Sequence, residues 1–142
     1  MIDVNQFLEE EKTKGNLMYQ FSLLLLELGN NLEHKGSEIK IKLKKIKQGV
    51  ALISEIIREQ KKRIKTIKLE ESEKTTLSIG LSKQTKALLD LYDSLINFKT
   101  EESYEETNKI DNVKSNIEEY KLSINKTQEF LKALKLKKVT EF

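Results

Sequence analysis

Residues 39–67 read IKIKLKKIKQGVALISEIIREQKKRIKTI, and this stretch decides the fold of the chain. Apolar residues recur in it at alternating steps of three and four, which is the spacing of a helix that buries one narrow seam against a partner helix. Gln60 is the only polar member of the seam, and such a residue often sets the register, since a misplaced amide is left unpaired. We therefore predict a coiled-coil interface formed by Ile39, Leu43, Ile46, Val50, Ile53, Ile57, Gln60, Ile64 and Ile67.

Two further seams follow the first, and both have the helical period. The second consists of Leu77, Leu81, Gln84, Leu88, Leu91, Leu95 and Phe98. The third consists of Ile110, Val113, Ile117, Tyr120, Ile124, Thr127, Leu131 and Leu134. Before the first seam, residues 1–36 carry a broader apolar face made of Leu17, Phe21, Leu24, Leu25, Leu28 and Leu32. No segment has the two-residue alternation of a strand, so we predict an all-α fold.

The breaks between the seams predict the helix boundaries. Gly29 and Gly36 bracket the end of an N-terminal helix within residues 1–36. No proline or glycine forces a stop after the first seam, so we expect one long heptad helix over residues 37–98, about 90 Å long. The alternative is a break at 70–76, where no side chain is apolar and the registers on either side do not match. A C-terminal amphipathic helix is expected over residues 104–138.

The composition favours narrow seams over a thick core. Charged residues make up 35% of the 142 residues and hydrophobic residues only 37%, a balance typical of long helices and coiled coils. Such a chain cannot fill a broad interior. We therefore predict that the long coiled-coil helix and the short helices form a bundle, either by dimerisation or by folding back within one chain. Of these two arrangements we expect the homodimer.

The sequence offers few groups for catalysis. It contains no cysteine and one histidine, His34, at a helix end where a solvated or capping role is expected. It has no phosphate-binding or dinucleotide-binding motif, so we predict a protein that is not an enzyme and needs no cofactor or metal. The longest apolar run, residues 23–26, is far shorter than the ~20 residues of a membrane span. The lack of cysteine fits a cytoplasmic location.

One block of the chain is strongly basic. Residues 35–68 carry twelve basic and three acidic side chains, which gives a net charge of +9. These lysines could bind the phosphates of a nucleic-acid backbone, but the block has no aromatic residue on which a base could stack. We therefore favour a solvated face beside the seam over a nucleic-acid interface. The basic face includes Lys44, Lys45, Lys61, Lys62 and Arg63.

Residues 87–95 read ALLDLYDSL, and this segment resembles the core motif of the GrpE family of nucleotide exchange factors. The residues that carry the resemblance are Leu88, Leu89, Asp90, Leu91, Tyr92, Asp93 and Leu95. The order of elements is also similar, with a long heptad helix before the motif and an acidic loop and a second amphipathic helix after it. The resemblance covers roughly residues 37–139 and does not include the small β wing that follows in the family.

The resemblance implies a co-chaperone function. In that family a rigid parallel dimer binds the open form of the nucleotide-binding domain of a DnaK-type chaperone. Preference for the open form speeds the release of ADP without covalent chemistry. The resemblance therefore implies a DnaK-type chaperone as the protein partner and a parallel homodimer built on the long helix.

A structural or adaptor bundle is the main alternative, such as a secretion chaperone or a small secreted helical protein. Such a protein would pack the first seam against the later seams within one chain, whereas an exchange factor would use the long helix for a parallel dimer. A nucleic-acid-binding basic helix is the third and weakest alternative. The packing of the first seam distinguishes the first two functions.

Overall fold

The computed structural model describes residues 2–30, 36–96 and 103–140 of the chain, and the side chains within 4–26, 40–96 and 111–137. These residues form four helices and no strand, which confirms the prediction of an all-α fold. The helices are α1 (Ile2–Asn30), α2 (Gly36–Ile64), α3 (Glu71–Ile96) and α4 (Ser103–Thr140). None of these described helices has the length and apolar character that a membrane span requires.

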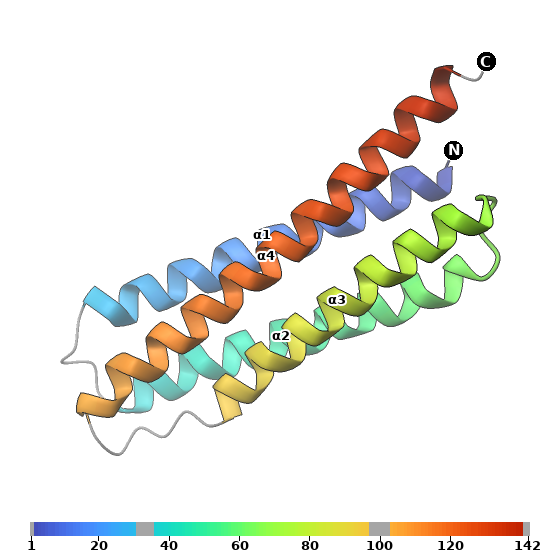
Figure 1. Ribbon diagram of the computed structural model, residues 1–142. Helices are drawn as coiled ribbons and strands as arrows, with labels where there is room; N and C mark the ends of the chain where they lie inside the picture. Colours follow the sequence, from blue (N-terminus) through green and yellow to red (C-terminus); the bar gives the residue numbers. More distant parts are fainter. Residues whose placement is uncertain (1, 31–35, 97–102, 141–142) are drawn as a thin grey trace.

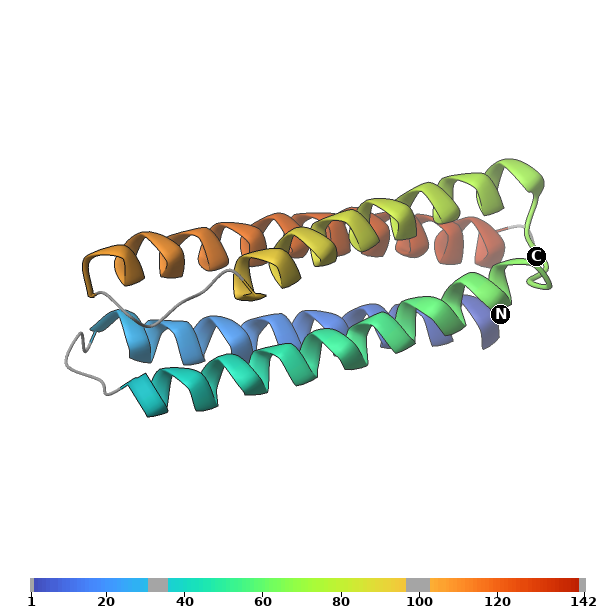
Figure 2. The ribbon, with the colours of Figure 1, turned by 90° about the horizontal axis from the view of Figure 1, so that it is seen from below.

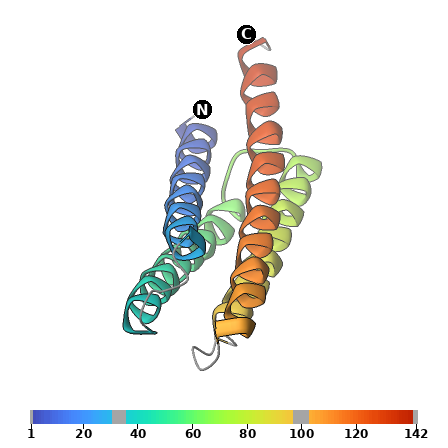
Figure 3. The ribbon, with the colours of Figure 1, turned by 90° about the vertical axis from the view of Figure 1, so that its left-hand side faces the viewer.

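The helices form a bundle in which each helix runs antiparallel to the next. In Figure 1, α1 and α4 lie together on one side and α2 and α3 on the other. The view from below separates the pair α1 and α2 from the pair α3 and α4 (Figure 2). Contacts therefore run in a ring from α1 through α2 and α3 to α4 and back to α1, as the end-on view shows (Figure 3).

The core is built from heptad positions of all four helices. Buried residues recur along each helix at steps of three and four, so that one stripe per helix faces the centre. The first seam supplies Leu43, Ile46, Val50, Ile53, Ile57, Gln60, Ile64 and Ile67 to this core. It is thus buried against other helices of the same chain. Ile39 lies in α2, but its side chain is outside the described ones.

Two apolar clusters fill the core, one toward each end of the bundle. The cluster next to the start of α1 and the end of α4 includes Phe7 and Leu81. The larger cluster toward the other end includes Ile46 and Ile117. Fully buried polar side chains separate the two clusters, and they belong to the same heptad stripes.

The expected continuous helix over residues 37–98 is wrong. The chain turns at residues 65–70, and α3 runs back along α2. The backbone N–H groups of Thr66 and Ile67 donate to the carbonyl of Arg63 at 3.1 and 2.9 Å, which closes the turn. The buried Ile67 side chain anchors the turn in the core. Hydrogen bonds and burial therefore reverse the chain without proline or glycine.

Acidic residues start α3 within the stretch that has no apolar side chain. The Glu73 carboxylate accepts a hydrogen bond from the backbone N–H of Glu70 at 3.0 Å, which caps the first turn. Glu71 adds a second negative charge there, where the helix dipole favours it. Glu73 is also buried at a core position, and Lys137 of α4 lies 3.4 Å from its carboxylate. The alternative of a break at 70–76 is therefore close to the observed turn.

The stripe that α1 buries differs from the predicted face. It consists of Val4, Phe7, Glu11, Lys14, Met18, Phe21 and Leu25, whereas Leu17 and Leu24 are only partly buried. Charged residues occupy two positions of the stripe and hide its heptad pattern, which is why the predicted face is rotated. The side chains of Leu28, Leu32 and His34 lie outside the described ones.

The terminal helices lie where the sequence predicts them, within two residues of the bounds predicted for the last one. α1 lies inside the segment predicted over residues 1–36, and α4 spans the helix predicted over residues 104–138. The break expected before that last helix covers residues 99–108. Residues 99–102 are outside the described residues, and residues 103–108 belong to α4.

Gly49 lets α1 and α2 approach closely. A Cβ atom at this position would overlap the ring of Phe21, which packs directly over the glycine. Because Phe21 is buried at a core position of α1, it cannot move aside without disturbing the core. Gly15 differs, since no atom lies within 4 Å of the place where its Cβ would be.

Alanine at these two glycines should change stability in opposite directions. Gly49→Ala displaces Phe21 and should lower the free energy of unfolding by about 1–3 kcal/mol. Gly15→Ala is the matched control and should raise it by about 0.5–1 kcal/mol, because alanine loses less backbone entropy in a helix. Urea unfolding followed by circular dichroism measures both values. Equal effects of the two substitutions would contradict the close packing at Gly49.

Candidate functional site

Five polar side chains meet at the centre of the bundle, between the two apolar clusters. They are Glu11, Lys14, Gln60, Gln84 and Thr127, and we call this set the polar layer. The first four have no exposed surface, and the last is 4% exposed. All five lie on the buried stripes of their helices, so the heptad pattern itself brings them together.

Lys14 is the centre of the polar layer. Its ammonium group donates to the Oε1 atoms of Glu11 at 2.8 Å, Gln60 at 2.6 Å and Gln84 at 2.7 Å. Three acceptors match the three N–H groups of a protonated lysine, so the geometry fits the charged form. One side chain of α1 is thereby joined to α2 and α3.

The other polar groups of the layer are paired as well. Gln84 Nε2 donates to Glu11 Oε2 at 2.9 Å and to Thr127 Oγ1 at 3.0 Å. Gln60 Nε2 donates to Glu11 Oε1 at 3.2 Å, and the Thr127 hydroxyl donates to the backbone carbonyl of Ser123 at 3.2 Å. These bonds connect the layer to all four helices.

Burial changes the ionisation of two groups at this level. Desolvation lowers the pKa of Lys14, and the adjacent Glu11 carboxylate opposes that change. Desolvation raises the pKa of Tyr120, whose fully buried ring lies beside the layer with its hydroxyl 3.4 Å from Gln84 Oε1. The salt bridge to Glu11 and the two glutamine amides thus stabilise the charged form of Lys14 and offset the free-energy cost of its burial.

The arrangement of the polar layer fixes the register of the helices. Its groups are closed off from solvent and satisfy one another, so they are not available to bind a substrate or transfer a proton. A shift of one helix along the bundle would move its polar residue into an apolar cluster, where its hydrogen bonds would be lost.

Sequence reasoning identifies only part of the polar layer. Gln60 is predicted to set the register, and Gln84 and Thr127 lie in the other two predicted seams. Glu11 and Lys14 are missed, because a charged residue in an N-terminal helix is normally assigned to the surface. The signal that could have found them is the continuous step of three and four that joins them to apolar residues on either side.

The family-like motif is divided between the core and the surface. Its buried half is Leu88, Leu91 and Leu95. Its exposed half is Leu89, Asp90, Tyr92 and Asp93. The two halves lie on opposite sides of α3, so only the second is open to a partner.

The predicted basic face is exposed at four of its five residues, namely Lys44, Lys45, Lys61 and Lys62 of α2. Arg63 differs from the prediction. Its guanidinium pairs with the Glu10 carboxylate of α1 and lies 4.9 Å from the centre of the Phe7 ring. Arg63 therefore ties the end of α2 to α1 instead of extending the exposed face.

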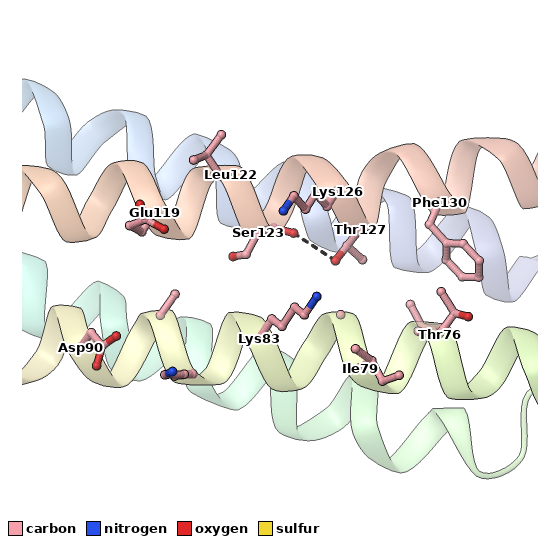
Figure 4. A pocket seen from close by; sticks show the side chains of 14 residues that line it. Thr76, Ile79, Lys83, Asp90, Glu119, Leu122, Ser123, Lys126, Thr127 and Phe130 are labelled. Carbon is pink, nitrogen blue, oxygen red and sulfur yellow. Dashed lines mark hydrogen bonds between the residues drawn. The ribbon is translucent and has the colours of Figure 1, made fainter.

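A groove runs along the outer surface between α3 and α4 and encloses about 540 Å³ (Figure 4). We call it the α3–α4 groove. Its lining includes Gly80, which has no side chain, and Ala87 and Ser123, whose side chains are short, so the space stays open. Ile79 and Leu122 also line it, and they are 50% and 54% exposed. The chain thus presents apolar surface in a hollow between two helices.

Charged side chains follow the length of the α3–α4 groove. Lys83 extends from α3 toward α4 near the middle, and Lys126 lies on the facing helix (Figure 4). Lys86 is a third lysine of the lining. Asp90 and Glu119 lie on opposite helices at one end (Figure 4). The sequence analysis assigned its basic face to α2 and missed these lysines on α3 and α4.

The sequence matches no model of a known protein family and no curated protein. Within the described ranges, no three histidine, cysteine, aspartate or glutamate side chains come together as a metal site would need. The α3–α4 groove is the candidate functional site because of its own geometry: an elongated hollow with apolar walls and a charged rim.

Lys14→Met should strongly destabilise the protein. Methionine keeps the apolar part of the side chain but leaves the buried Glu11 carboxylate without its cation, which costs about 3–5 kcal/mol. Lys12→Met, at an exposed position of the same helix, is the matched control and should change the free energy of unfolding by less than about 0.5 kcal/mol. Urea unfolding measures both. A loss of less than about 1 kcal/mol in Lys14→Met would show that the polar layer does not depend on this charge.

Proposed function

We propose that the protein is a non-catalytic, protein-binding helical bundle and that its α3–α4 groove holds a helix of another protein. The observation that carries this proposal is the pair of half-exposed apolar side chains, Ile79 and Leu122, in an elongated hollow between two helices. A hollow of this shape suits a further helix, whose apolar face would remove both side chains from water.

The packing of the heptad stripes supports a binding surface on the outside of the bundle. The stripes of all four helices pack against one another within one chain, so their apolar residues are already covered. This is the packing expected of the structural or adaptor bundle. We further propose that the stripes interlock as in a coiled coil, in keeping with Phe21 fitting over Gly49.

The placement of the ionisable residues supports a role without catalysis. Glu11 and Lys14 are fully buried in the polar layer and satisfied there. The charged residues of the α3–α4 groove surround apolar side chains, as the polar rim of a protein interface does. The cytoplasmic location predicted from the sequence is part of this proposal.

Selection of helical peptides from a display library on the full-length protein tests the proposal. Wild type should enrich peptides with an apolar stripe. The double variant Ile79→Ser/Leu122→Ser should not enrich them, because it removes the apolar walls of the groove. Ile41→Ser/Leu52→Ser is the matched control, since these two side chains are 57% and 53% exposed on α2 and lie outside the groove lining.

The folding of every variant is compared by circular dichroism before selection. Failure of the folded wild type to enrich any peptide over a support without protein would count against a protein-binding function. Equal enrichment on the groove variant and on wild type would place the binding surface elsewhere.

The exchange-factor function implied by the resemblance is a second candidate. Its support is the exposed half of the motif, in which Leu89 is 57% and Tyr92 41% exposed on the outside of α3. A parallel homodimer through the first seam would require α2 to leave the bundle, because that seam is buried within the chain. The predicted homodimer would otherwise form through the outer faces of intact bundles.

Release of a fluorescent ADP analogue from a DnaK-type chaperone tests this second candidate. The exchange-factor function predicts faster release with wild type and loss of the acceleration with Leu89→Ser/Tyr92→Ser. The control Ile41→Ser/Leu52→Ser should accelerate release as wild type does. An unchanged rate in the presence of folded wild type would exclude this function for the chaperone tested.

A further inference from the structure

The α3–α4 groove has a defined length. At one end, Asn116 Nδ2 donates to the backbone carbonyl of Asp90 at 3.2 Å and so links α4 to α3. Beyond the other end, Lys137 of α4 lies 3.4 Å from the carboxylate of Glu73. The groove lining on α3 runs from residue 76 to residue 90, which corresponds to about 21 Å of helix. A partner helix of about four turns covers that distance.

The side chains of the groove lining change in character along this length. Thr76, Ile79 and Phe130 lie together at the end next to the α2–α3 turn (Figure 4). Lys83 and Lys126 occupy the middle, and Asp90 and Glu119 the far end (Figure 4). The order of these side chains from that turn is therefore apolar, basic and then acidic, and Leu122 lies between Lys126 and Glu119 on α4 (Figure 4).

The lysines of the groove lining make no close ion pair with an acidic side chain of the described residues. Elsewhere in the described part of the chain, Lys62, Lys121 and Lys137 each lie within 4.0 Å of an acidic side chain. No such ion pair within the described residues involves Lys83, Lys86 or Lys126. Three positive charges around an apolar hollow attract negative charge from a binding partner.

The shape of the groove favours a single helix over a second copy of this chain. Two copies that met at this face would bring two hollows together and leave space between them. A single amphipathic helix is convex and can fill the hollow, with its flanking residues reaching the charged rim on both helices. The exposed rim charges would then pair across the interface instead of with water.

We propose that the α3–α4 groove selects an amphipathic helix of another protein whose charges run in the complementary order. Resting on the proposed protein-binding function, this inference specifies the partner as a helix of about four turns. Its apolar stripe covers Ile79 and Leu122. Acidic residues beside the stripe face Lys83, Lys86 and Lys126. Basic residues at one end face Asp90 and Glu119.

A peptide library with a fixed apolar stripe tests this charge order. The probes are four-turn helical peptides in which the positions beside the stripe vary among Glu, Lys and Gln. Selection on the full-length protein should enrich Glu at the middle positions and Lys at one end of the helix. The affinity of the best enriched peptide should fall about tenfold with Lys83→Glu/Lys126→Glu, because two favourable charge pairs become repulsive.

Two controls connect the charge preference with the groove. Lys44→Glu/Lys45→Glu makes the same change in net charge on α2, outside the groove lining, and should leave the affinity within about twofold. A peptide with its middle Glu residues replaced by Lys should bind the Lys83→Glu/Lys126→Glu protein better than wild type. Such reversal is not expected if the substitutions merely disturb the fold.

The outcomes separate this inference from the protein-binding function. Enriched peptides without a charge order, whose binding is lost with Ile79→Ser/Leu122→Ser, would overturn the inference and leave the proposed function standing. No enrichment at all would overturn both. Sedimentation measures self-association, and a dimer of wild type that Leu122→Ser abolishes would identify a second copy as the occupant and would also overturn the inference.

Discussion

In any packing of the helices, the buried ammonium group of Lys14 needs three hydrogen-bond acceptors. Burial of a charge without partners costs more free energy than single apolar contacts contribute. Glu11, Gln60 and Gln84 supply these acceptors. The leucine and isoleucine layers of the core resemble one another and would tolerate a slip by one heptad. The polar layer does not tolerate such a slip, because its hydrogen bonds would be lost. The layer therefore selects one register for α1, α2 and α3.

The same layer also determines where α4 lies. Gln84 donates to Thr127 of α4, and a Cβ atom at Gly80 would come within 3.0 Å of the Thr127 hydroxyl oxygen. A glycine therefore provides the space that the polar contact needs. On the outer side of this contact, the short side chains of Ala87 and Ser123 leave the hollow that forms the α3–α4 groove. A partner helix would meet a surface whose backbone is already held in place, which reduces the entropy lost on binding.

The sequence predicts most of the helical fold because apolar residues with a three-and-four period leave few alternatives. The turn at residues 65–70 could not be predicted in this way. The end of α2 and the start of α3 depend on the burial of Ile67 in the core and on the capping of α3 by Glu73. Both of these depend on how the bundle packs. The polar layer was only partly predictable, since Lys14 becomes a core residue only when amides from two other helices surround it. The groove was not predictable, because its lysines form one surface only after α3 and α4 pair.

The antiparallel pairing of α1 with α4 brings the start of one helix and the end of the other to the same end of the bundle (Figure 1). A pulling force applied between those two ends would peel the helices apart instead of sliding them along each other. The apolar cluster around Phe7 and Leu81 would open first, a few contacts at a time. The next barrier is the polar layer, where the hydrogen bonds that join Lys14 and Glu11 of α1 to Gln60 and Gln84 would have to break together. If force acts on both of these ends, the bundle would therefore open in two steps, the first at a low force and the second at a higher force.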